Sequence, residues 1–227
     1  MEPVAEPISI ALPKGRILEQ ALPLLAQAGI DLEEVVAKAG RRLLLPTPLG
    51  GRVLLVKPVD VPTYVEHGIA DLGIAGLDTL SEEDRDLYEP VDLGIGRCRM
   101  VVAEPIEGAS ERARARERSG APLRVATKYP HIALRHYRAR GIQAQVITLV
   151  GSVELGAVTG LADQVVDLVE SGETLRQNQL REVETILNVT SRLIVHPASL
   201  KLKRARIEAL IEALRAASDP SKQTRRA

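Results

Sequence analysis

Short apolar runs alternate along this chain with segments in which apolar residues recur at helical spacing. Residues 8–12 form an apolar, β-branched run, and after a turn at 13–16 apolar residues recur every three or four positions up to Gly29. A strand-like run followed by an amphipathic segment is the pattern of a β–α unit. Because the alternation continues, the sequence predicts an α/β fold with mainly parallel sheets. Further strands are expected at residues 71–75, 97–103, 124–127, 145–149, 164–169 and 191–196.

Turn residues and glycines locate the other elements. Residues 42–45 and 52–57 flank a segment rich in Pro and Gly, which predicts a hairpin. The polar tail at 219–227 is expected to be disordered. Helices are expected at 61–67 and 132–140, after a cap at Ser152, from Thr174 onward, and as one long amphipathic helix at 199–217.

Residues 111–118 carry charge at nearly every second position. One interpretation is an arm that binds nucleic acid. The other is a solvated helix whose acids and arginines pair along its surface. The whole chain favours the helix, because Lys plus Arg and Asp plus Glu both number 30 and the net charge is zero.

One segment of the chain is echoed later in the sequence. Residues 68–76 (GIADLGIAG) resemble residues 160–168 (GLADQVVDL), and each segment leads into an apolar strand. Two lobes of similar build explain the echo, although a chance match in a chain rich in Ala, Leu and Gly is the alternative. We expect a discontinuous lobe I at 1–100 with 190–227, and a lobe II at 101–189. Ligands of open α/β sheets bind beyond the carboxyl ends of the strands.

Composition narrows the class of protein. Aromatic residues make up 2% of the 227 residues, with no Trp or Phe, which disfavours a stacking platform for single-stranded nucleic acid. The single cysteine, Cys98, cannot form an intramolecular disulfide and is expected to be a small core residue. No apolar run approaches the roughly 20 residues of a membrane-spanning helix, and the start of the chain is a poor secretory signal. We therefore expect a soluble, cytoplasmic protein with neither nucleic acid nor membrane as a partner.

The strongest chemical signal lies at residues 165–175. A buried strand ends in Asp167, a short loop contains Gly172, and Thr174 then begins a helix. Backbone N–H groups at a helix start bind phosphate, and Gly172 permits close approach of the backbone. Asp167 can accept hydrogen bonds from two ribose hydroxyls. The alternative is an ordinary strand–turn–helix in which Thr174 is the N-cap.

Other candidate groups occupy strand-to-helix turns. Glu154 follows Gly151-Ser152 at a helix start, where it either faces a ligand or stabilises the helix. Lys14 and Arg16 suit a polyphosphate, or are two solvated charges on a loop. Arg97 follows a glycine pair at 94 and 96. The four histidines show no metal-ligand spacing, so no dedicated protein metal site is expected.

Six motifs, taken in order, resemble ATP phosphoribosyltransferase. They are Ala11-Leu12-Pro13-Lys14-Gly15-Arg16, residues 70–76, Gly94-x-Gly96-x-Cys98-Arg99, Ala126-Thr127-Lys128-Tyr129-Pro130, residues 151–155 and residues 167–175. The resemblance covers about residues 8–203. It implies two α/β lobes like those of type II periplasmic binding proteins, with the active site between them. It also implies transfer of a phosphoribosyl group from phosphoribosyl pyrophosphate to N1 of ATP, with Mg²⁺, at the entry to histidine biosynthesis.

The resemblance also implies roles for residues and partners. Asp167 would bind the ribose hydroxyls, and Glu154 would assist at the ribose or the metal. Lys14 and Arg16 would face nucleotide or pyrophosphate charges, with Arg97 a further participant. The 5-phosphate would be bound by Glu170, Ser171, Gly172, Glu173 and Thr174.

The length of the chain points to the short form of the family. That form works with a regulatory subunit related to histidyl-tRNA synthetase, so we expect a homodimeric catalytic core within a hetero-oligomer. The rival hypothesis is a non-catalytic two-lobed binding module, because a fold does not fix a function.

Overall fold

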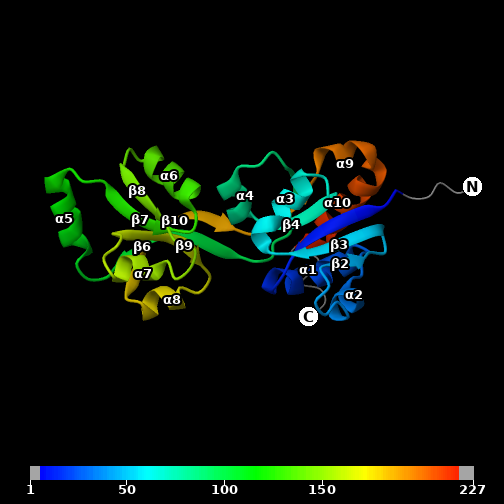
Figure 1. Ribbon diagram of the computed structural model, residues 1–227, viewed down its shortest axis with the longest axis horizontal. Coiled ribbons are helices and arrows are strands. Elements are labelled where there is room, and N and C mark those ends of the chain that lie inside the picture. Colours follow the sequence, from blue (N-terminus) through cyan, green and yellow to red (C-terminus); the bar gives the residue numbers. More distant parts are fainter. Residues whose placement is uncertain (1–5, 220–227) are drawn as a thin grey trace, which may run out of the picture. The chain divides into compact units, whose positions relative to one another are not determined.

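The chain divides into two compact units, each built on its own sheet (Figure 1). The structure is a computed structural model and describes residues 6–219. Unit 1 holds the described residues up to Leu80, Asp84–Gly96 and those from Thr190 on. Unit 2 holds Ser81–Glu83 and Arg97–Val189. The predicted polar tail lies, after Asp219, outside the described residues.

Unit 1 contains a mixed sheet with a parallel centre. β1 pairs in parallel with β3 and β4, whereas β2, β11 and β5 join in antiparallel pairings. The strands lie in the order β2 (Leu44–Pro46), β3 (Gly50–Val56), β1 (Ile8–Pro13), β4 (Leu72–Gly76), β11 (Ser191–Val195) and β5 (Tyr88–Asp92). The helical elements that start in this unit are α1 (Arg16–Gln27), α2 (Glu33–Ala37), the 3-10 turn η1 (Pro58–Asp60), α3 (Val61–Glu66), α4 (Leu77–Glu83), α9 (Pro197–Leu202) and α10 (Arg204–Ser218).

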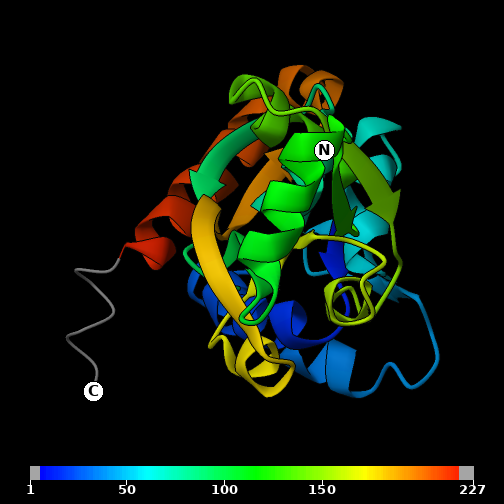
Figure 2. The same ribbon diagram turned by 90° about the vertical axis from the view of Figure 1, so that its left-hand side faces the viewer.

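Unit 2 contains the second mixed sheet. β7 pairs in parallel with β8 and β9, and β6 joins β9 and β10 in antiparallel pairings. Its strands lie in the order β10 (Leu180–Val189), β6 (Cys98–Pro105), β9 (Gln164–Val169), β7 (Leu123–Thr127) and β8 (Ala144–Thr148). Its other helices are α5 (Ala109–Ser119), which faces the viewer in Figure 2, α6 (Pro130–Ala139), α7 (Glu154–Val158) and α8 (Glu173–Gln177).

Helices pack on both faces of the unit 2 sheet, and strand periodicity decides which side chain meets which helix. Val165 and Val169 of β9 pack with residues of α7 and α8 in one apolar cluster. Val166 points the other way and packs with residues of α6. Because side chains alternate along a strand, Asp167 lies on the same face as Val165 and Val169.

The structure corrects the prediction of mainly parallel sheets. Both sheets are mixed, because each parallel centre is extended by antiparallel strands. Sequence reasoning also missed β10 and expected helix from Thr174 onward. β10 is the edge strand of its sheet and carries exposed charged residues, which mask the strand pattern and protect an edge from unwanted pairing.

The predicted single helix at 199–217 is in fact two helices that meet at Lys203. The Lys203 ammonium donates to both carboxylate oxygens of Asp71, at 2.8 and 3.0 Å. Lys203 has φ −115° and ψ 34°, so the backbone leaves the helical region where this buried partner holds the side chain. A tertiary contact therefore overrides a continuous amphipathic pattern.

Two local predictions about helices also change. Ser152 is not the cap of α7, because the residue before the helix is Val153 and Ser152 has φ 48°. Helix α5 forms as predicted, but Arg116 reaches off the helix to Asp163. Cys98 is half-buried on β6. Within residues 6–219, no helix has the length and apolar character to cross a membrane.

Candidate functional site

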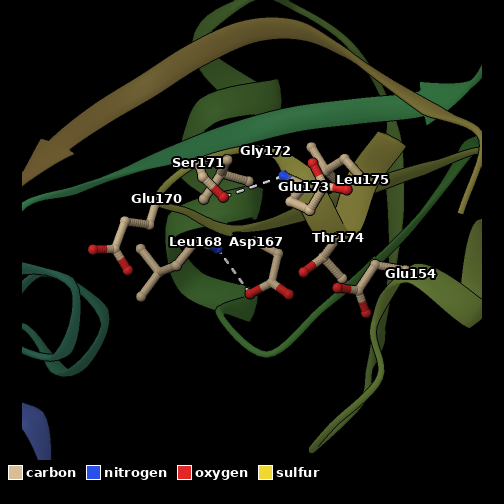
Figure 3. Close-up of a pocket in the computed structure, with 10 residues that line it drawn as sticks. Glu154, Asp167, Leu168, Glu170, Ser171, Gly172, Glu173, Thr174 and Leu175 are labelled. Carbon is tan, nitrogen blue, oxygen red and sulfur yellow. Dashed lines mark hydrogen bonds between the residues drawn. The ribbon is translucent and has the colours of Figure 1, made fainter. Parts of the chain in front are cut away.

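A cavity of about 270 Å³ in unit 2 collects most of the predicted site residues. Its walls come from the end of β9, the loop that follows, the start of α8 and the first residue of α7. The lining residues are Glu154, Asp167, Leu168, Val169, Glu170, Ser171, Gly172, Glu173, Thr174 and Leu175. Figure 3 shows Asp167, Thr174 and Glu154 side by side, while Glu170 extends at the other end of the loop.

The loop between β9 and α8 takes a conformation that favours glycine. Gly172 has φ 77° and immediately precedes α8. The Ser171 hydroxyl accepts a hydrogen bond from the Glu173 N–H at 3.3 Å. Thr174 is the second residue of α8 and not its N-cap, so the capping interpretation of Thr174 is wrong. The first N–H groups of a helix lack partners within the helix, and the first three residues of α8, Glu173, Thr174 and Leu175, line the cavity.

Behind the loop, a bidentate ion pair connects two neighbouring strands. Arg99 of β6 donates to both carboxylate oxygens of Glu182 on β10, at 2.7 and 3.1 Å. A Cβ atom on Gly172 would lie 3.3 Å from one of these oxygens. Gly172 therefore lies against this ion pair, which gives Arg99 of the Cys98-Arg99 motif a structural role.

Glu154 reaches the cavity because α7 packs closely on the sheet. A Cβ atom on Gly156 would lie 2.6 Å from the Ala126 Cβ of β7, so only glycine permits this approach. Val153 and Ala157 are buried in the apolar cluster that also contains Val165. The burial of these neighbours leaves Glu154, the first residue of α7, at the edge of the cavity.

The cavity is acidic, and its electrostatics centre on Asp167. Burial raises the pKa of Asp167 above its usual range, and the negative charge of Glu154 raises it further. The Leu168 N–H, which donates to Asp167 at 2.8 Å, and the Lys128 ammonium both oppose this rise in pKa. Hydrogen bonds from Arg176 and Gln177 lower the pKa of Glu173. The cavity therefore disfavours the charged form of Asp167, whereas the hydrogen bonds to Glu173 favour the charged form of that residue.

The predicted cationic residues lie elsewhere in the chain. Both Lys14, on the loop between β1 and α1, and Arg16, the first residue of α1, are exposed in unit 1. Arg97 is exposed at the first position of the main segment of unit 2. None of the three lines the cavity described above.

The donor set of the cavity fits a hard divalent cation. Within residues 6–219, no cluster of three or more His, Cys, Asp or Glu side chains could hold a metal by itself. Asp167 and Glu154 nevertheless place carboxylate oxygens, which Mg²⁺ prefers, at one cavity. A cation near them would relieve the repulsion that raises the pKa of Asp167.

Comparison with known proteins identifies the family. The family model of ATP phosphoribosyltransferase (HisG) matches residues 57–216. The chain belongs to the ATP phosphoribosyltransferase family. It is 51% identical to the ATP phosphoribosyltransferase of Acidithiobacillus ferrooxidans over 215 residues, which cover 94% of this chain and 98% of that protein. It therefore catalyses the first step of histidine biosynthesis, and the hypothesis of a non-catalytic binding module is wrong.

Solved structures confirm the fold of this phosphoribosyltransferase. The ATP phosphoribosyltransferase (HisG:HisZ) complex from Thermotoga maritima contains a chain with a TM-score of 0.75 and 30% identity, covering 93% of this chain and 98% of that one. The aliphatic sulphonate binding protein SsuA of Escherichia coli matches with a TM-score of 0.55 and 12% identity, over 97% of this chain and 75% of that one. The predicted likeness to periplasmic binding proteins is therefore confirmed as a likeness of fold.

Sequence reasoning about this phosphoribosyltransferase missed one charged group near Asp167. Lys128 follows the last residue of β7, and the register of the parallel pair sets Thr127 opposite Val166. The next residues along the two strands are Lys128 and Asp167. A lysine directly after a parallel strand was a signal present in the sequence, but only strand order shows that β7 lies beside β9.

Proposed function

We propose that the cavity of unit 2 binds phosphoribosyl pyrophosphate through its ribose 5-phosphate half. One observation carries the proposal: Asp167 lines the same cavity as the loop in which Gly172 immediately precedes α8. Backbone N–H groups and the hydroxyls of Ser171 and Thr174 offer donors to a 5-phosphate. The Asp167 carboxylate accepts hydrogen bonds from the ribose hydroxyls. The site then holds the sugar at both ends and fixes the orientation of its C1 atom.

The reaction needs orientation and charge stabilisation more than acid–base catalysis. The lone pair on N1 of the adenine forms a bond to C1 of the ribose, and the C1–oxygen bond breaks so that its electron pair leaves with pyrophosphate. Because N1 is unprotonated, no base has to remove a proton before the bond forms. Carboxylates beside the ring favour the oxocarbenium character of the transition state. Holding N1 and C1 together supplies much of the rate, through effective concentration.

Glu154 is proposed to assist at the ribose or at the metal that accompanies the substrate. Mg²⁺ bound with phosphoribosyl pyrophosphate would supply positive charge that neutralises the pyrophosphate leaving group. Its oxygen preference suits Asp167 and Glu154. Lys14, Arg16 and Arg97 are proposed to contact nucleotide or pyrophosphate charges, since Lys supplies a point charge and Arg a bidentate fork.

We further propose that the chain acts as the short-form catalytic subunit with a HisZ-type regulatory subunit, which resembles histidyl-tRNA synthetase. The T. maritima relative is a HisG:HisZ complex, and that chain is covered to 98% by this one. A homodimeric core within a cytoplasmic hetero-oligomer is the assembly we propose. Size measurement of the chain alone and with the partner tests it, and a chain that stays monomeric in both would overturn it.

The experiment that tests the site is an assay of phosphoribosyl-ATP formation with Asp167→Asn. The chain is assayed alone and with a HisZ-type subunit, and KM for phosphoribosyl pyrophosphate is measured separately from KM for ATP. We expect kcat/KM for phosphoribosyl pyrophosphate to fall roughly 10- to 100-fold, as for the loss of a charge-assisted hydrogen bond.

The matched control is Asp86→Asn, which removes an exposed carboxylate in unit 1. It should leave both KM values unchanged. An Asp167→Asn enzyme with the kinetics of the unchanged chain would overturn the proposed ribose site, while the family activity would stand.

A further inference from the structure

The residues that line the cavity carry negative charges without lining cations to balance them. Four acidic residues line it, namely Glu154, Asp167, Glu170 and Glu173. No Lys or Arg is among its lining residues, which all belong to the part of the chain that the structure describes. Phosphoribosyl pyrophosphate carries a phosphate and a pyrophosphate, so acidic residues repel it unless cations stand nearby. Glu173 is hydrogen-bonded to Arg176, which satisfies that acid but leaves Asp167 and Glu154 to be balanced.

Lys128 is the cation that the sheet brings to this position. β7 and β9 are parallel neighbours, and the pairing of Thr127 with Val166 sets Lys128 and Asp167 at the same edge. Its positive charge acts on Asp167 and lowers the pKa of that carboxyl, against the effects of burial and of Glu154. The side chain of Lys128 is exposed, so its ammonium is accessible to a ligand.

The backbone around Lys128 is held on both sides. The buried Thr127 hydroxyl donates to the Val166 carbonyl of β9 at 2.7 Å and accepts from the Tyr129 N–H at 2.8 Å. The Lys128 ammonium lies 5.7 Å from the centroid of the Tyr129 ring, in the range of a cation–π contact. The Thr127 hydroxyl thus links the backbone on both sides of Lys128 to Val166, the residue before Asp167. These hydrogen bonds hold Lys128 and Asp167 in register.

We propose that Lys128 is a substrate-binding residue of this phosphoribosyltransferase, with its ammonium contacting the pyrophosphate of phosphoribosyl pyrophosphate. The inference rests on the proposed ribose and 5-phosphate site. The loop after β9 takes the 5-phosphate and Asp167 the ribose, so a cation beside Asp167 and outside the loop meets the group carried by C1. A lysine suits this place, because its flexible stem lets a point charge follow the pyrophosphate as it departs.

The test is a comparison of Lys128→Met and Lys128→Arg with the unchanged chain, in the complex with the HisZ-type subunit. Lys128→Met should raise KM for phosphoribosyl pyrophosphate roughly 10- to 100-fold, the range for one charge-assisted contact, with KM for ATP unchanged. Lys128→Arg should recover most of the loss. Arg138→Met, which removes an exposed cation from α6 in the same unit, is the matched control and should leave both KM values unchanged.

Direct binding separates the two phosphorylated ends of the substrate. Calorimetry with inorganic pyrophosphate and with ribose 5-phosphate should show weaker binding of pyrophosphate alone in Lys128→Met. Weaker binding of ribose 5-phosphate with pyrophosphate unaffected would overturn the assignment to the pyrophosphate. Unchanged KM and unchanged binding of both probes would overturn the proposal altogether.

The Lys128→Arg variant distinguishes a charge effect from a merely structural one. Recovery of KM for phosphoribosyl pyrophosphate by a second kind of cation shows that the positive charge at this position binds the substrate. If neither Lys128→Met nor Asp167→Asn changes KM for phosphoribosyl pyrophosphate, the proposed ribose site is overturned as well. If only Asp167→Asn changes it, the ribose site stands and only the proposed role of Lys128 is overturned.

Discussion

Asp71 and Asp163 occupy equivalent positions in the two units, each directly before the parallel strand β4 or β9. The Asp71 carboxylate accepts a hydrogen bond from the Ser9 N–H at 2.8 Å, and the Asp71 N–H donates to the Ser9 carbonyl. Asp163 makes the same two hydrogen bonds with the backbone of Arg124. Each carboxylate is buried and pairs with cations, Lys203 for Asp71 and both Arg116 and Arg124 for Asp163. The sequence echo between residues 68–76 and 160–168 therefore corresponds to the same structural feature in both units, an aspartate that hydrogen-bonds to the backbone of the neighbouring parallel strand.

We expect Asp163→Asn to destabilise unit 2 by about 3 kcal/mol, because it leaves Arg116 and Arg124 without their buried partner. Thermal and denaturant unfolding of the variant measure the change. Asp86→Asn, at an exposed site, is the control. A loss no larger than in Asp86→Asn would mean that these two ion pairs do not stabilise the unit.

The same two carboxylates predict how stability depends on pH. Burial favours the neutral form, but hydrogen bonds and cations outweigh it and lower the pKa of both Asp71 and Asp163 in the folded chain. Their stabilising contribution is therefore complete above the unfolded pKa of about 4 and is lost as pH falls through the lower folded values. Unfolding free energies measured from pH 6 to pH 2 should fall most steeply below pH 4, and less steeply in the double variant Asp71→Asn/Asp163→Asn.

The pKa of Asp167 is shifted in the opposite direction to those of Asp71 and Asp163, which predicts that activity and stability respond oppositely to its removal. Burial and Glu154 raise its folded pKa, so its charge costs folding free energy at neutral pH. Asp167→Asn should raise the melting temperature while lowering activity. The gain should shrink as pH falls below the raised pKa and vanish below about pH 4, where the acid is neutral in both states. A melting temperature lower than that of the unchanged chain at pH 7 would contradict this account.

Gly172 offers a test of loop conformation with a matched control. Gly172 and Gly141 have φ of 77° and 69°, so alanine at either position should cost about 1 kcal/mol of stability. Only Gly172→Ala should also raise KM for phosphoribosyl pyrophosphate, because Gly141 has open space around its Cβ position and does not line the cavity. Equal KM values in the two variants would argue against a phosphate at this loop.

Thr174 tests the contribution of a single hydroxyl. Thr174→Val keeps the shape of the side chain and should raise KM for phosphoribosyl pyrophosphate roughly 3- to 10-fold, as for one neutral hydrogen bond. Thr174→Ser should restore it. Thr159→Val removes a hydroxyl that bonds the Leu155 carbonyl on α7, outside the cavity lining, and serves as the control.

The sequence by itself determined the features whose signals are contiguous. Apolar runs located β1, β4, β7 and β9 to within about a residue, because a buried strand needs an unbroken apolar stretch. The loop at 167–174 was recognisable for the same reason, since carboxylate, glycine and hydroxyl follow one another along the chain. The order of the six motifs predicted the family, which the comparisons confirm.

Tertiary structure decided whatever depends on residues distant in the sequence. Strand β10 is charged because it is an edge, and the helix break at Lys203 follows from the buried partner Asp71, so local pattern concealed both. The nearness of Lys128 to Asp167 depends on the register of two strands whose paired residues, Thr127 and Val166, are far apart along the chain. Hydrophobic periodicity reports which face of an element is buried, but only pairing and packing decide which charges meet.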